Sequence, residues 1–214
     1  MGNGVTELVF ILDRSSSMEG LEGDTVEGFN AMLEKQRSQP GACLVSTVLF
    51  DSHCQLLHDR IPLQEIPPMT VQDYSVRGCT ALIDAIGGAI DRISRAHEDS
   101  PEEERPEHTV FVITTDGMEN ASRSYDADRV RRMIKKRRKT SGWEFLFLGA
   151  NIDAVSTAGS FGIRESRAAE YVNDSRGICV NYEAISEAIS RFRRNVPVTK
   201  DWKHNIEKDH SGRN

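Results

Sequence analysis

The amino-acid sequence predicts an α/β domain built on an open, doubly wound, mostly parallel sheet with helices on both faces. Short and almost wholly apolar runs alternate along the chain with longer segments whose apolar residues recur at helical spacing. Wholly apolar strands are expected where both faces of a parallel sheet are covered. One strand pair is expected to be antiparallel, because residues 51–53 form a tight turn between the runs 43–50 and 54–57.

The predicted strands follow the apolar runs, most of which are rich in β-branched and aromatic residues and bounded by turn residues. We expect strands over residues 7–12, 43–50, 54–57 with a continuation toward 61, 109–115, 143–148 and 168–172. The predicted helices are recognised by their spacing and their ends. For example, Asp126 or Ser124 can cap a helix over 127–140, and Gly142 can end it. Further helices are expected over 26–38, 80–93, 153–160 and 182–194.

Length and composition fit one globular domain. The chain has 214 residues, of which 38% are hydrophobic and 28% charged. We expect a single domain over residues 1–195 and a polar, loosely held tail over 196–214.

Charge and cysteine usage favour a cytoplasmic protein. The net charge of −6 argues against a general nucleic-acid binder, and no apolar run approaches the roughly 20 residues that span a bilayer. The start of the chain lacks the pattern of a secretory signal. Gly2 fits a myristoylation pattern, but that pattern is frequent by chance. The cysteines lack metal-ligand spacing and are expected to be reduced thiols.

A candidate metal site begins where the first strand ends. Asp13, Ser15 and Ser17 follow the run 8–12 at alternate positions, so in an extended segment their side chains face the same way. Two later residues are expected at the same edge of the sheet: Thr80 at the start of a helix, and Asp116 at the end of the strand 109–115. Carboxylate and hydroxyl oxygens are ligands that suit Mg²⁺. Asp13-x-Ser15-x-Ser17 alone is also compatible with a turn bonded to its own backbone.

These three pieces, in this order, resemble the metal-ion-dependent adhesion site (MIDAS) of von Willebrand factor type A domains. The resemblance covers roughly residues 6–194 and implies the Rossmann-like fold of that family, with a single antiparallel edge strand. It implies Mg²⁺ or Mn²⁺ as the metal, with Ser15, Ser17 and Thr80 as hydroxyl ligands and the two aspartates bound directly or through water. It also implies a binding role rather than catalysis, in which a partner protein supplies an Asp or Glu carboxylate. Stand-alone intracellular members resemble adaptors beside an ATPase or a stress-response kinase and phosphatase.

Two other functions stay open as alternatives. A metal-dependent phosphoester hydrolase can use metal-bound water, although the chain shows no evident nucleophile or general base. Two related functions are excluded by single residues. An aspartyl-nucleophile phosphatase needs a second carboxylate where this chain has Ser15, and an EF-hand loop needs a glycine where it has Met18. A weaker alternative is nucleic-acid binding through the basic helix 127–140, whose charges are more simply explained as a solvated face.

Glu119 and Asn120 follow Asp116 closely and are predicted to lie on the rim of the metal site. There they either form a polar loop or help to select the partner.

Overall fold

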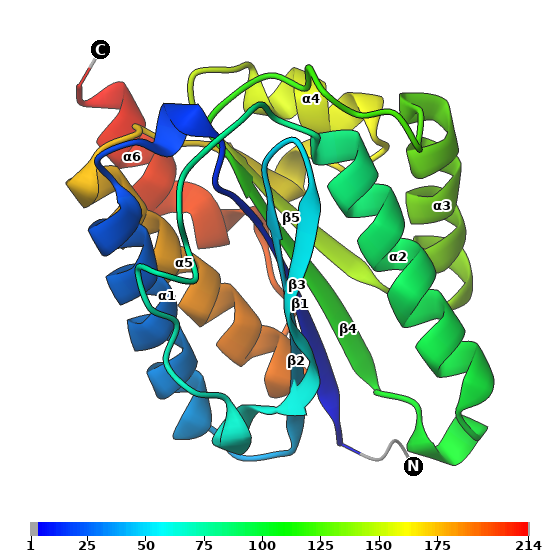
Figure 1. Ribbon diagram of the computed structural model, residues 1–214. Coiled ribbons are helices and arrows are strands. Elements are labelled where there is room, and N and C mark those ends of the chain that lie inside the picture. Colours follow the sequence, from blue (N-terminus) through cyan, green and yellow to red (C-terminus); the bar gives the residue numbers. More distant parts are fainter. Residues whose placement is uncertain (1–3, 214) are drawn as a thin grey trace.

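The computed structural model describes residues 4–213 and shows a six-stranded sheet between two layers of helices (Figure 1). The strand order is β3-β2-β1-β4-β5-β6, and β2 and β3 pair antiparallel while the other neighbours are parallel. The strands are β1 (Thr6–Asp13), β2 (Cys43–Phe50), β3 (Cys54–Pro62), β4 (His108–Thr115), β5 (Glu144–Gly149) and β6 (Ala168–Glu170). The predicted fold class, including its antiparallel edge strand, is confirmed.

The helices are α1 (Glu22–Arg37), α2 (Leu82–Asp99), α3 (Ala127–Thr140), α4 (Ala154–Ser160), α5 (Ser175–Arg193) and α6 (His204–Ser211). Helices α1, α5 and α6 cover one face of the sheet, and α2, α3 and α4 cover the other (Figure 1). Short 3₁₀ turns complete the structure: η1 (Ser16–Met18), η2 (Leu63–Glu65), η3 (Glu102–Glu104), η4 (Glu165–Arg167) and η5 (Lys200–Lys203). No helix among residues 4–213 is long and apolar enough to cross a bilayer.

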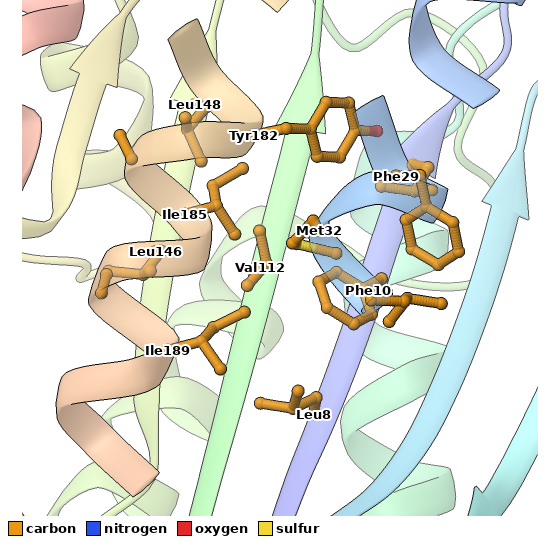
Figure 2. Close-up of a cluster of buried hydrophobic side chains, with 14 of the residues drawn as sticks. Leu8, Phe10, Phe29, Met32, Val112, Leu146, Leu148, Tyr182, Ile185 and Ile189 are labelled. Atoms are coloured by element: carbon orange, nitrogen blue, oxygen red, sulfur yellow. The ribbon is translucent and has the colours of Figure 1, made fainter. Parts of the chain in front are cut away.

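Alternating side chains of β1 supply both halves of the core. Leu8 and Phe10 pack with α1 and α5, whereas Val9 and Ile11 pack under α2 (Figure 2 shows the first cluster). The Phe10 ring meets Phe29 of α1 edge to face, with centroids 5.2 Å apart. Each fully buried side chain of this size stabilises the fold by about 1.5–3 kcal/mol. This packing holds β1, and therefore the residues at its carboxyl end, in a fixed position.

The last residues differ from the polar tail that we expected over 196–214. Val198, Trp202 and Ile206 are buried, and the indole Nε1 of Trp202 donates to the carbonyl of Ser166 at 2.9 Å. Trp202 and Ile206 are one helical turn apart, a pattern too short to be distinctive in the sequence. The segment is therefore part of the folded domain as far as residue 213.

Helix α5 begins earlier than predicted, at Ser175 rather than 182. Asp174 caps it by accepting a hydrogen bond from the backbone N–H of Gly177 at 2.8 Å. A Cβ at Gly177 would lie 1.9 Å from the carbonyl oxygen of Val172, so this first turn needs glycine. Glycine is a weak helix former, which hid the start of the helix. Gly2, the candidate lipidation site, lies outside the described residues.

Strand order reverses between β1 and β4, because the chain runs from β1 outward to β2 and β3 and then returns to β4 on the other side. Leu12 of β1 lies beside Thr114 of β4, so the two strands end together. Ligands of open α/β sheets bind in the crevice at such a reversal. The predicted metal residues lie at this edge.

Candidate metal site

Asp13 ends β1 and is held by its neighbours on two sides. One carboxylate oxygen accepts the backbone N–H of Ser15 at 2.7 Å, and the other accepts the hydroxyl of Thr115 at 2.6 Å. Only 2% of Asp13 is exposed. The Thr115 contact joins the ends of β1 and β4, and sequence reasoning assigned it no role. The sequence offered one signal for Thr115, namely its position directly before Asp116.

The hydroxyls of the first loop connect Asp13 to the second aspartate. Ser15 Oγ and Ser17 Oγ are 3.0 Å apart, and Ser17 Oγ donates to Asp116 Oδ1 at 2.5 Å. The other oxygen of Asp116 accepts Nδ2 of Asn173 at 2.9 Å. Asn173 lies between β6 and α5, far from the other residues in sequence, and nothing in the sequence pointed to it.

Thr80 reaches the same place from the start of α2. A Cβ built on Gly117 would lie 3.5 Å from Thr80 Oγ1 and 3.6 Å from Ser17 Oγ, so these two hydroxyls border one small space beside Gly117. Backbone bonds fix Thr80 there: its N–H donates to Asn120 Oδ1 at 2.9 Å, and its carbonyl accepts the N–H of Asn120 at 3.0 Å. The structure thus brings Asp13, Ser15, Ser17, Thr80 and Asp116 together.

Glu119 and Asn120 form the loop between β4 and α3. Glu119 accepts the N–H groups of Ala121 and Ser122 with one oxygen, at 2.9 and 2.7 Å. Its other oxygen accepts the N–H of Ile83 in the first turn of α2 at 2.8 Å and the hydroxyl of Ser122 at 2.7 Å. The two side chains therefore hold this loop against the start of α2. Their contact with a partner stays a prediction.

Arg14 braces the first loop from the opposite side. It is 1% exposed, its Nε donates to Asp51 at 2.9 Å, and a guanidinium N–H donates to Gln55 at 2.7 Å. The hydroxyl of Tyr74 donates to the backbone carbonyl of Asp13. Sequence reasoning missed Arg14 and Tyr74. A charged residue at a buried strand end was the available signal for the arginine.

The charge of the site is negative and uncompensated. Burial raises the pKa of Asp13, and burial together with the negative charge of Asp13 raises the pKa of Asp116. Among residues 4–213, no Lys, Arg or His forms an ion pair with either aspartate. Two buried carboxylates and three hydroxyls without a basic partner fit a hard divalent cation such as Mg²⁺ or Mn²⁺. Asp13, Ser15, Ser17, Thr80 and Asp116 are the residues that can hold it.

The described residues contain no cluster of three or more His, Cys, Asp or Glu side chains able to hold a metal. Asp13 and Asp116 are thus the two anionic groups that a cation would meet at this edge of the sheet.

Solved structures share the architecture of this chain. Proximal thread matrix protein 1 (PTMP1) from the mussel byssus, in a structure with a zinc-occupied MIDAS motif, matches with a TM-score of 0.60 at 16% identity over 88% of this chain. The vWF domain of the type V pili tip protein Mfa5 from Porphyromonas gingivalis matches with a TM-score of 0.60 at 10% identity, over 91% of this chain and 98% of that one. A von Willebrand factor type A structure from Catenulispora acidiphila matches with a TM-score of 0.57 at 11% identity, over 86% of this chain and 42% of that one.

The fold and the edge where the polar residues meet define a Rossmann-like α/β domain with its site at the strand reversal. The chain has the von Willebrand factor type A fold. It spans 46% of the length of PTMP1. A scan against models of protein families finds no match, and a search of curated proteins finds no similar sequence.

Proposed function

We propose that this chain is a binding module that holds Mg²⁺ or Mn²⁺ at Asp13, Ser15, Ser17, Thr80 and Asp116, and that a partner protein completes the metal shell with an Asp or Glu carboxylate. The observation that carries the proposal is the pair of buried aspartates, bridged by hydroxyls and lacking any basic partner among residues 4–213. The bound metal supplies a positive charge that attracts the partner's acid.

The comparisons support a binding role in coarser terms. The neighbours are named for a byssus matrix protein and for pilus proteins, and the matrix protein is described with a zinc-occupied MIDAS motif. Asp13 is engaged by Ser15 and Thr115, so neither oxygen is placed as a free nucleophile. We propose binding rather than catalysis on these grounds. An ATPase or a stress-response protein as the partner is the expectation that comes from the family resemblance.

We place the module in the cytoplasm. All four cysteines are unpaired, and Cys54, Cys79 and Cys179 are exposed, which suits a reducing compartment.

Calorimetric titration of metal-free protein with Mg²⁺ and with Mn²⁺ tests the metal site. Wild-type protein is expected to bind one ion, and an Asp13→Ala, Asp116→Ala double variant is expected to bind none. An Asp99→Asn variant is a control, because Asp99 is exposed at the end of α2 and forms no ion pair among the described residues. Normal binding by the double variant would contradict the proposal.

Affinity capture with wild-type bait, with and without EDTA, tests the partner. A partner held through the metal is lost on chelation and is not captured by the double variant. Capture that is unaffected by both changes would show that the partner binds elsewhere.

A further inference from the structure

Helix α3 carries basic residues of two kinds. Some are paired across to α2: Arg129 with Asp91 at 3.4 Å, and Arg137 with Glu98 at 2.6 Å. Lys135, Arg138 and Lys139 form no ion pair among residues 4–213. The same holds for Arg131, Arg132 and Lys136, so more cations of α3 lack an ion pair than are paired to α2.

These three residues border a concavity of about 370 Å³, together with Arg164, Trp143 and Glu144. Its volume lies within the range of about 300–1,000 Å³ that is usual for small-molecule sites. Glu144 is the only acid on its wall, and that carboxylate already accepts Nε of Arg167 at 2.9 Å. The concavity is consequently surrounded by positive charge.

Arg138 is held in place within this wall. One guanidinium N–H donates to the carbonyl of Gly162 at 2.7 Å, and the side chain is partly buried. Burial, followed by the positive charge of Arg164, lowers the pKa of Arg138. Arg138 and Arg164 line the same concavity and repel one another, so an anion between them is stabilising.

The helix dipole accounts for only part of this arrangement. Cations in the last turn of α3 offset the partial negative charge of the helix end. Arg164 lies outside α3, in the segment between α4 and η4, yet it lines the same concavity. The helix dipole gives no reason for its presence there, whereas a bound anion does.

We propose that the concavity bordered by Lys135, Arg138, Lys139 and Arg164 binds the diphosphate group of a small molecule. The forked N–H groups of arginine and the point charge of lysine are suited to phosphate oxygens. Glu144 begins β5, so the concavity lies at the amino end of the parallel strands, away from the metal site at their carboxyl ends. It is thus a second site, independent of the proposed metal-dependent function.

Calorimetric titration with inorganic pyrophosphate, in EDTA so that the metal site plays no part, tests this proposal. An Arg138→Gln, Arg164→Gln variant is expected to bind at least about a hundredfold more weakly, because it loses the charged hydrogen bonds of two arginines, each worth about tenfold or more in affinity. An Arg132→Gln, Lys136→Gln variant removes two exposed, unpaired charges of α3 outside the concavity and is expected to change affinity less than about twofold. A parallel titration with ADP distinguishes a nucleotide from free pyrophosphate as the source of the diphosphate.

A second variant, Lys135→Gln with Lys139→Gln, keeps the test informative if the arginine variant unfolds, because both lysines are exposed and make no side-chain hydrogen bond among residues 4–213. It is also expected to weaken binding. Equal loss in the control and concavity variants would overturn the proposal in favour of a general charge effect. Absence of pyrophosphate binding by wild-type protein, or tighter binding of duplex DNA than of pyrophosphate, would also overturn it.

Discussion

Replacing Asp116 by Asn removes one of two buried negative charges at the metal site while keeping the shape of the side chain. Asp116 is 1% exposed and accepts hydrogen bonds from Ser17 and Asn173. An asparagine can preserve both contacts, because its oxygen can accept from Asn173 and its amide can donate to the rotatable hydroxyl of Ser17. The substitution therefore changes charge with little change in packing.

The expected effects on stability have opposite signs with and without metal. Relief of an uncompensated buried charge is worth several kcal/mol, and the two hydrogen bonds each weaken by about 1 kcal/mol, so metal-free protein gains about 1–2 kcal/mol. This raises the melting temperature by about 2–8 °C for a chain of this size. Mg²⁺ at a hundred times its dissociation constant stabilises wild-type protein by about 2.7 kcal/mol, or about 5–10 °C, and the variant loses this gain.

The assay is thermal unfolding followed by circular dichroism, in EDTA and in Mg²⁺, for wild type, Asp116→Asn and the exposed control Asp99→Asn. The control is expected to retain the full response to metal. A variant that is less stable than wild type in EDTA would show that the Asp116 charge is compensated. A variant that still responds to Mg²⁺ would show that Asp116 is not needed to bind the metal.

Three further predictions concern pH, the Thr80 loop and the end of the chain. The pKa values of Asp13 and Asp116 are raised in the folded protein, so protonation of these carboxyls contributes to stability; this contribution is present below the unfolded pKa and is lost as pH rises through the folded pKa. In EDTA, the stability advantage of Asp116→Asn should therefore shrink as pH falls through this window, because Asp116 then becomes neutral as well. An advantage that is independent of pH would contradict the reasoning. Asn120→Ala removes the acceptor for the Thr80 N–H and is expected to weaken Mg²⁺ binding about tenfold by calorimetry, with a small effect on the melting temperature; unchanged affinity would show that Thr80 is positioned without it. Trp202→Ala is expected to cost about 3–5 kcal/mol in denaturant unfolding, because Trp202 is 5% exposed; a cost near zero would mean that the segment after α5 contributes nothing to the fold.

The elements that sequence reasoning found are those whose signal is local. The apolar run that becomes β1 and the capped basic helix α3 contain their own evidence, in periodicity and in end residues such as Asp126. The start of α5 and the whole of α6 were missed because their signals were weak over a few residues. Their helical structure depends on contacts with the rest of the domain, such as that of Trp202 with Ser166.

By itself, the sequence determined the order of β1–β6 and α1–α5, the antiparallel edge pair and the five candidate metal residues, because each strand, helix and piece of the motif consists of residues close together in the chain. Only the tertiary structure decided which groups support them. Asn173 contacts Asp116 across 57 positions, and Ser17 contacts it across 99. The basic concavity likewise needs Arg164 to lie beside α3. Hydrogen bonds and charge clusters between distant segments depend on how layers pack, and no periodicity in the chain encodes that.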